Sequence, residues 1–235
     1  MVKKIAVIGS SGFVGNAICE VIDKKSNYQC IRVTRNDDLK FSIKNADIII
    51  HAANPSKRFW AEQNPEIDFQ ESVAKTSFIK ENTAGKKIIL ISSISARTQL
   101  HTVYGRNRRA CELIIGNEKN LIIRLGPLYG SKKFQGALFD ILSNRTVFLS
   151  GDSEYAYAPI EYCGKKIISS LSSSGMMELG AFNSIKLSEL ARILGSTSHF
   201  QGDHDSQIPK DFQSDAPDAY DVIDFSRNLL AKGLM

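Results

Sequence analysis

Short apolar runs alternate with longer amphipathic stretches along most of this 235-residue chain. The apolar runs are typical of strands buried on both faces, and we expect such strands at residues 5–8, 30–33, 47–50, 88–91 and 121–125. Helical spacing of apolar residues predicts helices at 13–23, 65–82, 103–116 and 137–143. Strands that alternate with helices indicate parallel strands joined by crossover helices. The pattern therefore predicts an α/β fold built on a doubly wound parallel sheet.

Two parts of the chain depart from this pattern. The connection between residues 34 and 47 is short for a parallel crossover, so we expect a single helical turn or none there. After Leu149 the alternation weakens, and we expect helices at 163–171 and 187–194 with a short strand near Phe182. We expect a single domain over residues 1–235, with a small C-terminal lobe formed mainly by residues 150–235.

The first strand runs directly into a glycine-rich turn, GSSGFVG at residues 9–15, where a helix is predicted to begin. Glycine lets backbone N–H groups approach a pyrophosphate at the positive end of a helix, and Gly15 permits close packing of helix and strand. The alternative is a turn whose glycines only relieve steric crowding. The strand before it and the helix after it favour dinucleotide binding. The candidate binding residues of the turn are Gly9, Ser11, Gly12, Phe13, Val14 and Gly15.

The glycine spacing resembles the G-x-x-G-x-x-G of the extended short-chain dehydrogenase/reductases, the NAD(P)-dependent epimerase/dehydratase family. Further segments are similar to motifs of that family in the same order: DIIIHAA at 47–53, ISS at 91–93, YGRNRRACE at 104–112, RLGPLYG at 124–130 and AFN at 181–183. The resemblance implies a Rossmann-type, NAD(P)-binding fold with a C-terminal substrate-binding lobe. It also implies cofactor contacts from Ala52, Ala53 and Pro127, and a homodimer formed through helices that include the one bearing Tyr104.

The end of the second strand bears on the choice of dinucleotide. An acidic residue there usually binds the ribose of NAD, whereas an arginine accommodates the phosphate of NADP. This chain has Arg35 at that position and Asp37 two residues later. Arg35 slightly favours NADP over NAD, although a solvated loop cation is the alternative for Arg35 and Asp37 remains a candidate for the ribose. Asp38 and Leu39 resemble the pair that contacts adenine in the family.

Tyr104 and Arg108 are four residues apart on a predicted helix, so both project from one face. A nearby positive charge stabilises the phenolate and makes a tyrosine usable as a general acid/base. In the family this cation is a lysine that also contacts the nicotinamide ribose. Arginine keeps the charge but does not give up its proton. We expect Tyr104 and Arg108 to be catalytic and to contact the cofactor. The ISS motif of the resemblance implies that Ser93, at the end of a strand, holds the substrate oxygen, although a role in the turn after the strand is the alternative for Ser93.

The motifs predict an NAD(P)-dependent oxidoreductase or epimerase that acts on the carbonyl or alcohol of a sugar or nucleotide sugar. Family dehydratases often place Asp-Glu after the catalytic hydroxyl residue, but Ile94 and Ser95 follow Ser93 here, which disfavours dehydration. Carbonyl reduction, alcohol oxidation and epimerisation need the same hydride and proton geometry and stay open. The alternative is a dinucleotide-binding sensor or scaffold that has lost catalysis, because the family's lysine is replaced.

Charge and cysteine content bear on which kinds of ligand and which cellular compartment remain possible. Thirty Lys and Arg against 25 Asp and Glu give a net charge of +5, and the cations are scattered rather than gathered in a nucleic-acid-binding stripe. Arg106, Arg109, Arg124 and the pair at 132–133 are candidate cations for a substrate diphosphate, although solvated surface charges are the alternative. The four cysteines lack metal or disulfide spacing, so free thiols and no metal are expected. No segment suggests secretion or a membrane span, and we expect a cytoplasmic protein.

Overall fold

The computed structural model describes residues 2–131 and 135–233 of the chain. Two compact units make up the structure. The first comprises Met1–Leu125 and Gly164–Met177, and the second comprises Gly126–Cys163 and Glu178–Met235.

A six-stranded sheet is the framework of the first unit, with the strand order β2-β1-β3-β4-β5-β9. Its strands are β1 (Lys3–Ile8), β2 (Tyr28–Val33), β3 (Ile48–His51), β4 (Lys87–Ser93), β5 (Leu121–Leu125) and β9 (Gly175–Leu179). The pairs β1–β2, β1–β3, β3–β4 and β4–β5 are all parallel. The order reverses at β1, as in a doubly wound sheet. The predicted fold class is confirmed.

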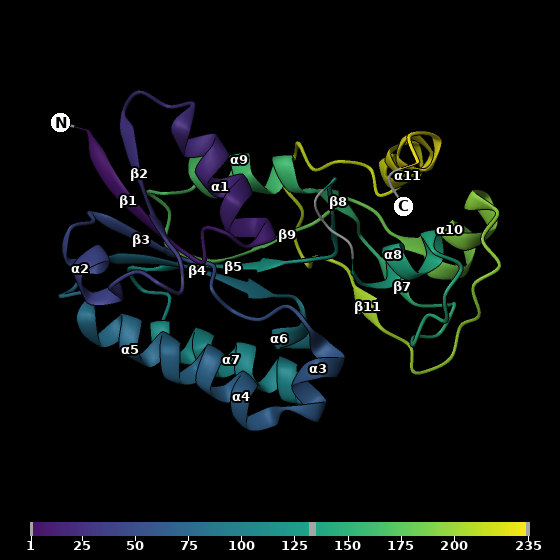
Figure 1. Ribbon diagram of the computed structural model, residues 1–235, viewed down its shortest axis with the longest axis horizontal. Coiled ribbons are helices and arrows are strands. Elements are labelled where there is room, and N and C mark those ends of the chain that lie inside the picture. The colour runs from purple at the N-terminus through teal and green to yellow at the C-terminus, as the bar shows by residue number, and fades with distance from the viewer. Residues whose placement is uncertain (1, 132–134, 234–235) are drawn as a thin grey trace. The chain divides into compact units, whose positions relative to one another are not determined.

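Helices cover both faces of this sheet. They are α1 (Phe13–Asp23), α2 (Leu39–Lys44), α3 (Arg58–Gln63), α4 (Pro65–Phe69), η1 (Gln70–Ala74), α5 (Lys75–Asn82), α6 (Ser95–Thr98), α7 (Val103–Ile115) and α9 (Ile160–Ser169), whose residues from Gly164 onward belong to this unit. Figure 1 shows α1 on one side of the sheet and α2, α4, α5 and α7 on the other. Every residue of β3 and β5 is buried, as the continuous apolar runs predict.

Three expectations are refined or overturned by the structure. The helix predicted at 65–82 is one rod of α4, η1 and α5, in which η1 is a π-helical segment. The crossover at 34–47 holds the six-residue α2, somewhat more than the single turn expected. The strand expected near Phe182 is wrong: β9 ends at Leu179, and the next strand begins at Ile185.

The second unit has its own apolar core and two small sheets. Its elements are β6 (Leu128–Tyr129), α8 (Ala137–Leu142), β7 (Glu154–Tyr155), β8 (Ala158–Pro159), β10 (Ile185–Lys186), α10 (Leu187–Leu194), β11 (Ser206–Gln207) and α11 (Asp221–Ala231). The strands pair as β10-β7-β11 and β6-β8. Ile141, Tyr155, Leu187, Leu190 and Val222 lie in the core that joins them.

The close packing of the turn between β1 and α1 can be tested by substitution of its glycines. A Cβ atom on Gly15 would lie 2.1 Å from the carbonyl oxygen of Gly9, whereas one on Gly12 would lie 3.2 Å from the same oxygen. We expect Gly15→Ala to lower the free energy of unfolding by about 1–3 kcal/mol or more, because overpacking forces the backbone to move. Gly12→Ala is the matched control and is expected to cost clearly less. Equal losses in urea unfolding would contradict this packing role.

Candidate active site

The glycine turn packs against the end of β3. An added Cβ on Gly9 would lie 2.7 Å from Cα of Ala53 and 2.8 Å from the carbonyl of Ala52. The N–H of Ala52 also donates to the carbonyl of Ile8, 2.9 Å away. The structure therefore brings Gly9, Ala52 and Ala53 together, as the parallel order of β1 and β3 requires.

The start of α1 has the features of a phosphate site. Gly12 is exposed, and a Cβ there would meet only the Gly9 carbonyl within 4 Å, so described protein atoms leave its outer side open. The N-cap residue of α1 is Gly12, which has no side chain to cap the helix, and the first turn contains no acidic residue that would repel an anion. Ser11 is exposed, while Phe13 and Val14 are half-buried. Backbone N–H groups at an uncapped helix start suit a pyrophosphate, so these residues fit a dinucleotide cofactor.

The two candidate ligands for the cofactor ribose, Arg35 and Asp37, have different surroundings in the loop after β2. The Asp37 carboxylate accepts hydrogen bonds from the N–H and Oγ1 of Thr34, at 2.7 and 2.6 Å, and these bonds hold the pKa of Asp37 below its usual value. The Arg35 side chain is 85% exposed and lies 3.7 Å from the Glu71 carboxylate. Asp37 is thus engaged within its own loop, whereas the guanidinium of Arg35 faces solvent.

Asp38 and Leu39 have structural roles at the start of α2. The Asp38 side chain accepts a hydrogen bond from the N–H of Phe41, at 3.0 Å, and so caps the helix. Leu39 packs against a core cluster that includes Ile43 and Ile79. Their contact with adenine stays a prediction.

Tyr104 and Arg108 lie against one another on the buried face of α7. The guanidinium carbon of Arg108 is 4.6 Å from the centre of the Tyr104 ring, as the i, i+4 spacing predicts. Only 1% of Arg108 and 7% of Tyr104 is exposed. Nη2 of Arg108 donates to the carbonyl of Pro55 and lies 4.0 Å from the Asp68 carboxylate. The cation beside the phenol is therefore held inside the first unit.

Ser93 ends β4 and begins the connection toward α7. Its Oγ accepts a hydrogen bond from the N–H of Ser95, at 3.2 Å, so the hydroxyl also serves the turn that starts α6. A Cβ on Gly105 would lie 2.0 Å from the Gln99 carbonyl oxygen and 2.8 Å from that of Ser95. Only a glycine next to Tyr104 lets α7 approach the segment that follows Ser93 this closely.

Glu112, which the sequence analysis included only as the last residue of a motif, is a buried carboxylate that fixes α7 to its neighbours. Oε1 of Glu112 accepts from Oγ of Ser92 (2.7 Å) and Nε of Arg124 (2.8 Å), while Oε2 accepts from Nη2 of Arg124 (2.7 Å) and Nη1 of Arg109 (3.0 Å). Arg124 and Arg109 are therefore used inside the protein rather than held ready for a substrate diphosphate. The available signal was the spacing of Tyr104, Arg108 and Glu112, which repeats every four residues.

His51 ends β3 as a buried, neutral residue. Its Nε2 lies 3.0 Å from Oγ1 of Thr76, and the Thr76 hydroxyl donates to the carbonyl of Ser72. Nε2 of His51 therefore carries the proton, while Nδ1 accepts from the N–H of Ala53. Burial, together with the charges of Arg108 and Lys75, lowers the pKa of His51 to about 3.

The remaining predicted residues lie elsewhere or outside this description. Pro127 belongs to the second unit, where its carbonyl accepts from the N–H of Ala158. The lysines at 132 and 133 fall outside the described residues. Cys19, Cys30, Cys111 and Cys163 are free, as expected.

Within 2–131 and 135–233, no group of three or more His, Cys, Asp or Glu side chains is placed to hold a metal ion. No helix in the same part of the chain is long and apolar enough to cross a membrane.

No protein-family model matches the chain, and no curated protein matches its sequence. Solved structures do match. UDP-N-acetylglucosamine 4-epimerase from Methanobrevibacter ruminantium is 16% identical, with 97% of each chain covered and a TM-score of 0.76. dTDP-4-dehydrorhamnose reductase from Bacillus anthracis, in complex with NADP, is 16% identical over 97% of this chain and 98% of that one, with a TM-score of 0.77.

UDP-glucuronic acid 4-epimerase from Bacillus cereus, in complex with NAD, is 17% identical over 96% of this chain and 99% of that one, with a TM-score of 0.73. At these identities the likeness establishes a shared fold. The Rossmann-type fold inferred from the sequence is confirmed.

The state of His51 predicts a pH dependence of stability. The unfolded chain binds a proton at this residue below about pH 6.5, whereas the folded chain does so only near pH 3. The stability that this difference provides is present above about pH 6.5 and is lost as the pH falls, by at most about 1.4 kcal/mol per pH unit. We expect His51→Gln to flatten the fall in the free energy of unfolding between about pH 6.5 and 4. Identical slopes for both proteins would show that His51 is not buried in the neutral form.

Proposed function

We propose that this protein is an NAD(P)-dependent oxidoreductase or epimerase that acts on the carbonyl or alcohol of a sugar or nucleotide sugar. The observation that carries the proposal is the Arg108 guanidinium, 4.6 Å from the centre of the Tyr104 ring, in the unit that also contains the glycine turn. Solved structures of the same fold include two nucleotide-sugar 4-epimerases and dTDP-4-dehydrorhamnose reductase.

The side chains have separate roles in the proposed reaction. A bound nicotinamide would accept or donate the hydride. The Tyr104 phenol gives a proton to the substrate oxygen in reduction, and its phenolate takes one in oxidation, with the guanidinium of Arg108 beside its ring. Ser93 accepts from the N–H of Ser95 and keeps its own hydroxyl proton to donate to the same substrate oxygen.

For the cofactor we favour NADP over NAD. Arg35 is the exposed cation after β2, and an arginine there suits a 2′-phosphate. Asp37, the rival ligand for an unphosphorylated ribose, is engaged by Thr34. Both cofactors are represented among neighbours of the same fold, since one is a complex with NADP and another with NAD.

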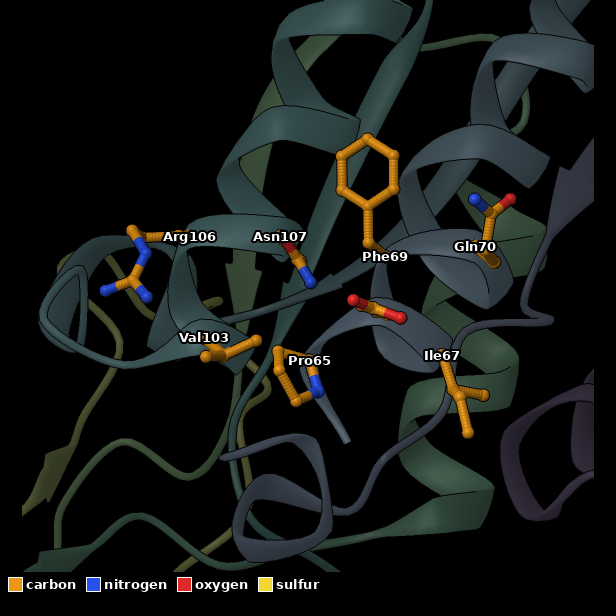
Figure 2. A pocket seen from close by; sticks show the side chains of 8 residues that line it. Pro65, Ile67, Phe69, Gln70, Val103, Arg106 and Asn107 are labelled. Carbon is orange, nitrogen blue, oxygen red and sulfur yellow. The ribbon is translucent and has the colours of Figure 1, made fainter. Parts of the chain in front are cut away.

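We further propose a homodimer through the outer face of α4 and α7. A groove of about 630 Å³ lies between these helices, lined by Pro65, Glu66, Ile67, Phe69, Gln70, Val103, Arg106 and Asn107 (Figure 2). Ile67 is 52% and Phe69 46% exposed, which is costly for apolar side chains left in water. Glu66 and Arg106 carry opposite charges on the two helices, so a two-fold axis can pair each with its opposite in a second copy.

A catalytically silent sensor or scaffold is the second candidate. It is favoured by the burial of Arg108, whose head is engaged by Pro55 and Asp68 and is 1% exposed. In this case a dinucleotide would bind without turnover.

Turnover separates the two candidates. We would assay reduction of dTDP-4-dehydrorhamnose with NADPH or NADH, and oxidation or epimerisation of UDP-glucose and UDP-N-acetylglucosamine with NADP⁺ or NAD⁺. In this panel we would compare Tyr104→Phe with the exposed control Tyr220→Phe. Tyr104→Phe is expected to bind the dinucleotide normally and to lose about 10²- to 10⁴-fold in kcat, the usual cost of a lost general acid/base. A rate that survives this change would place the chemistry elsewhere. Dinucleotide binding without turnover on the whole panel would favour the sensor.

The dimer has its own measurement. Sedimentation equilibrium of the native protein is expected to give twice the mass of the 26.0 kDa chain. Ile67→Glu should give a monomer, because it buries an unpaired charge in the groove. Phe41→Glu alters a more exposed apolar residue on α2, outside the groove, and should leave the dimer intact. A native monomer would contradict the proposed interface.

A further inference from the structure

The carboxylate of Asp68 is fully buried on α4, at 0% exposure. Its Oδ2 accepts a hydrogen bond from the side-chain amide of Asn107, at 2.8 Å. Its Oδ1 lies 4.0 Å from Nη2 of Arg108 and, among the described residues, receives no hydrogen bond. A buried anion is tolerated when a cation compensates it, and the guanidinium of Arg108 is the cation that faces this carboxylate.

The guanidinium makes three contacts at once. Its central carbon lies 4.6 Å from the centre of the Tyr104 ring, while Nη2 donates to the carbonyl of Pro55 and faces Asp68. A planar guanidinium holds its donors in a fixed arrangement, whereas the ammonium of a lysine is a compact point charge. The three contacts together fix the position of the charge beside the phenol.

We propose that Asp68 is a positioning residue for Arg108, and that the two side chains act as a matched pair that holds the guanidinium over Tyr104. This inference rests on the proposed function, because it assigns the pair a purpose in proton transfer at Tyr104. Asp68 itself acts only through Arg108.

Loss of the carboxylate predicts a specific defect. Without Asp68 the guanidinium is a buried charge with no counter-ion, and it gains by turning away from the ring toward solvent. Tyr104 then loses its neighbouring positive charge, although the helix that carries both residues is still fixed by Glu112. When both partners are replaced by neutral side chains, no uncompensated charge remains, so most of the stability should return while the activity does not.

The first test is a double-mutant cycle in urea unfolding. We would compare the native protein with Asp68→Asn, Arg108→Met and the double variant, and use the exposed Glu81→Gln on α5 as the control for loss of a carboxylate. Each single variant should unfold at a clearly lower urea concentration, and the double variant should unfold closer to the native midpoint than the sum of the two losses predicts. Additive losses would overturn the pairing of Asp68 with Arg108.

The second test measures kcat and KM at a temperature well below every unfolding midpoint, with the cofactor and the panel substrate that the native protein turns over. Asp68→Asn should lower kcat at least about tenfold with little change in KM, because a misplaced group slows the chemical step more than it weakens binding. Asp68→Glu should recover part of the rate, and the double variant should not. Glu81→Gln should match the native rate.

Alternative outcomes can be told apart. If Asp68→Asn does not fold, Asn107→Ala removes the amide that orients the carboxylate and should lower kcat in the same direction by a smaller factor. A purely structural role for Asp68 predicts an unchanged kcat in every variant that folds, which would overturn the positioning role alone. A native protein that turns over none of the panel contradicts the proposed function and the positioning role together, while the unfolding cycle still decides whether the two residues pair.

Discussion

The structure depends on the buried carboxylate of Glu112. Its two oxygens accept four hydrogen bonds, two from Arg124 on β5, one from Ser92 on β4 and one from Arg109 on α7 itself. A carboxylate that is 1% exposed is stable only while these bonds are made, because loss of a partner leaves an uncompensated charge in a medium of low dielectric constant. Any slide or rotation of α7 against the sheet would break several of them. The helix is therefore locked in register with the two strands.

The hydrogen bonds of Glu112 also position the candidate catalytic residues. Tyr104, Arg108 and Glu112 are spaced four residues apart and lie on the same face of α7. Each charge on that face has an opposite charge nearby, Arg124 beside Glu112 and Asp68 beside Arg108. His51, at the end of β3, stays neutral because burial and the charges of Arg108 and Lys75 oppose its protonation. In the interior of the first unit, the guanidinium of Arg108 is thus held beside the phenol of Tyr104.

The local pattern of apolar residues predicted the sheet and its helices. Strands buried on both faces are continuous apolar runs, and helices that pack on a sheet are amphipathic, so both can be recognised in the sequence. The strand at 121–125 matches β5 at both ends, and the pair Tyr104 and Arg108 follows from spacing within one helix. The contact of Arg108 with Asp68 was not predictable, because it joins residues 40 positions apart in sequence through tertiary packing. Gly105 was missed for the same reason, since its need for glycine arises from the carbonyl of Gln99 in the connection between α6 and α7.

Dinucleotide binding by the turn at Gly9–Gly15 can be measured directly. Native protein and Gly12→Val would be titrated with NADPH and NADH, and binding followed by the fluorescence of the reduced nicotinamide. We expect saturable binding at one site per chain, tighter for NADPH. That binding should be lost in a Gly12→Val protein that still unfolds cooperatively, because the added side chain occupies the open side of the turn. Undiminished affinity in the folded variant, or no binding of either dinucleotide by the native protein, would contradict this expectation.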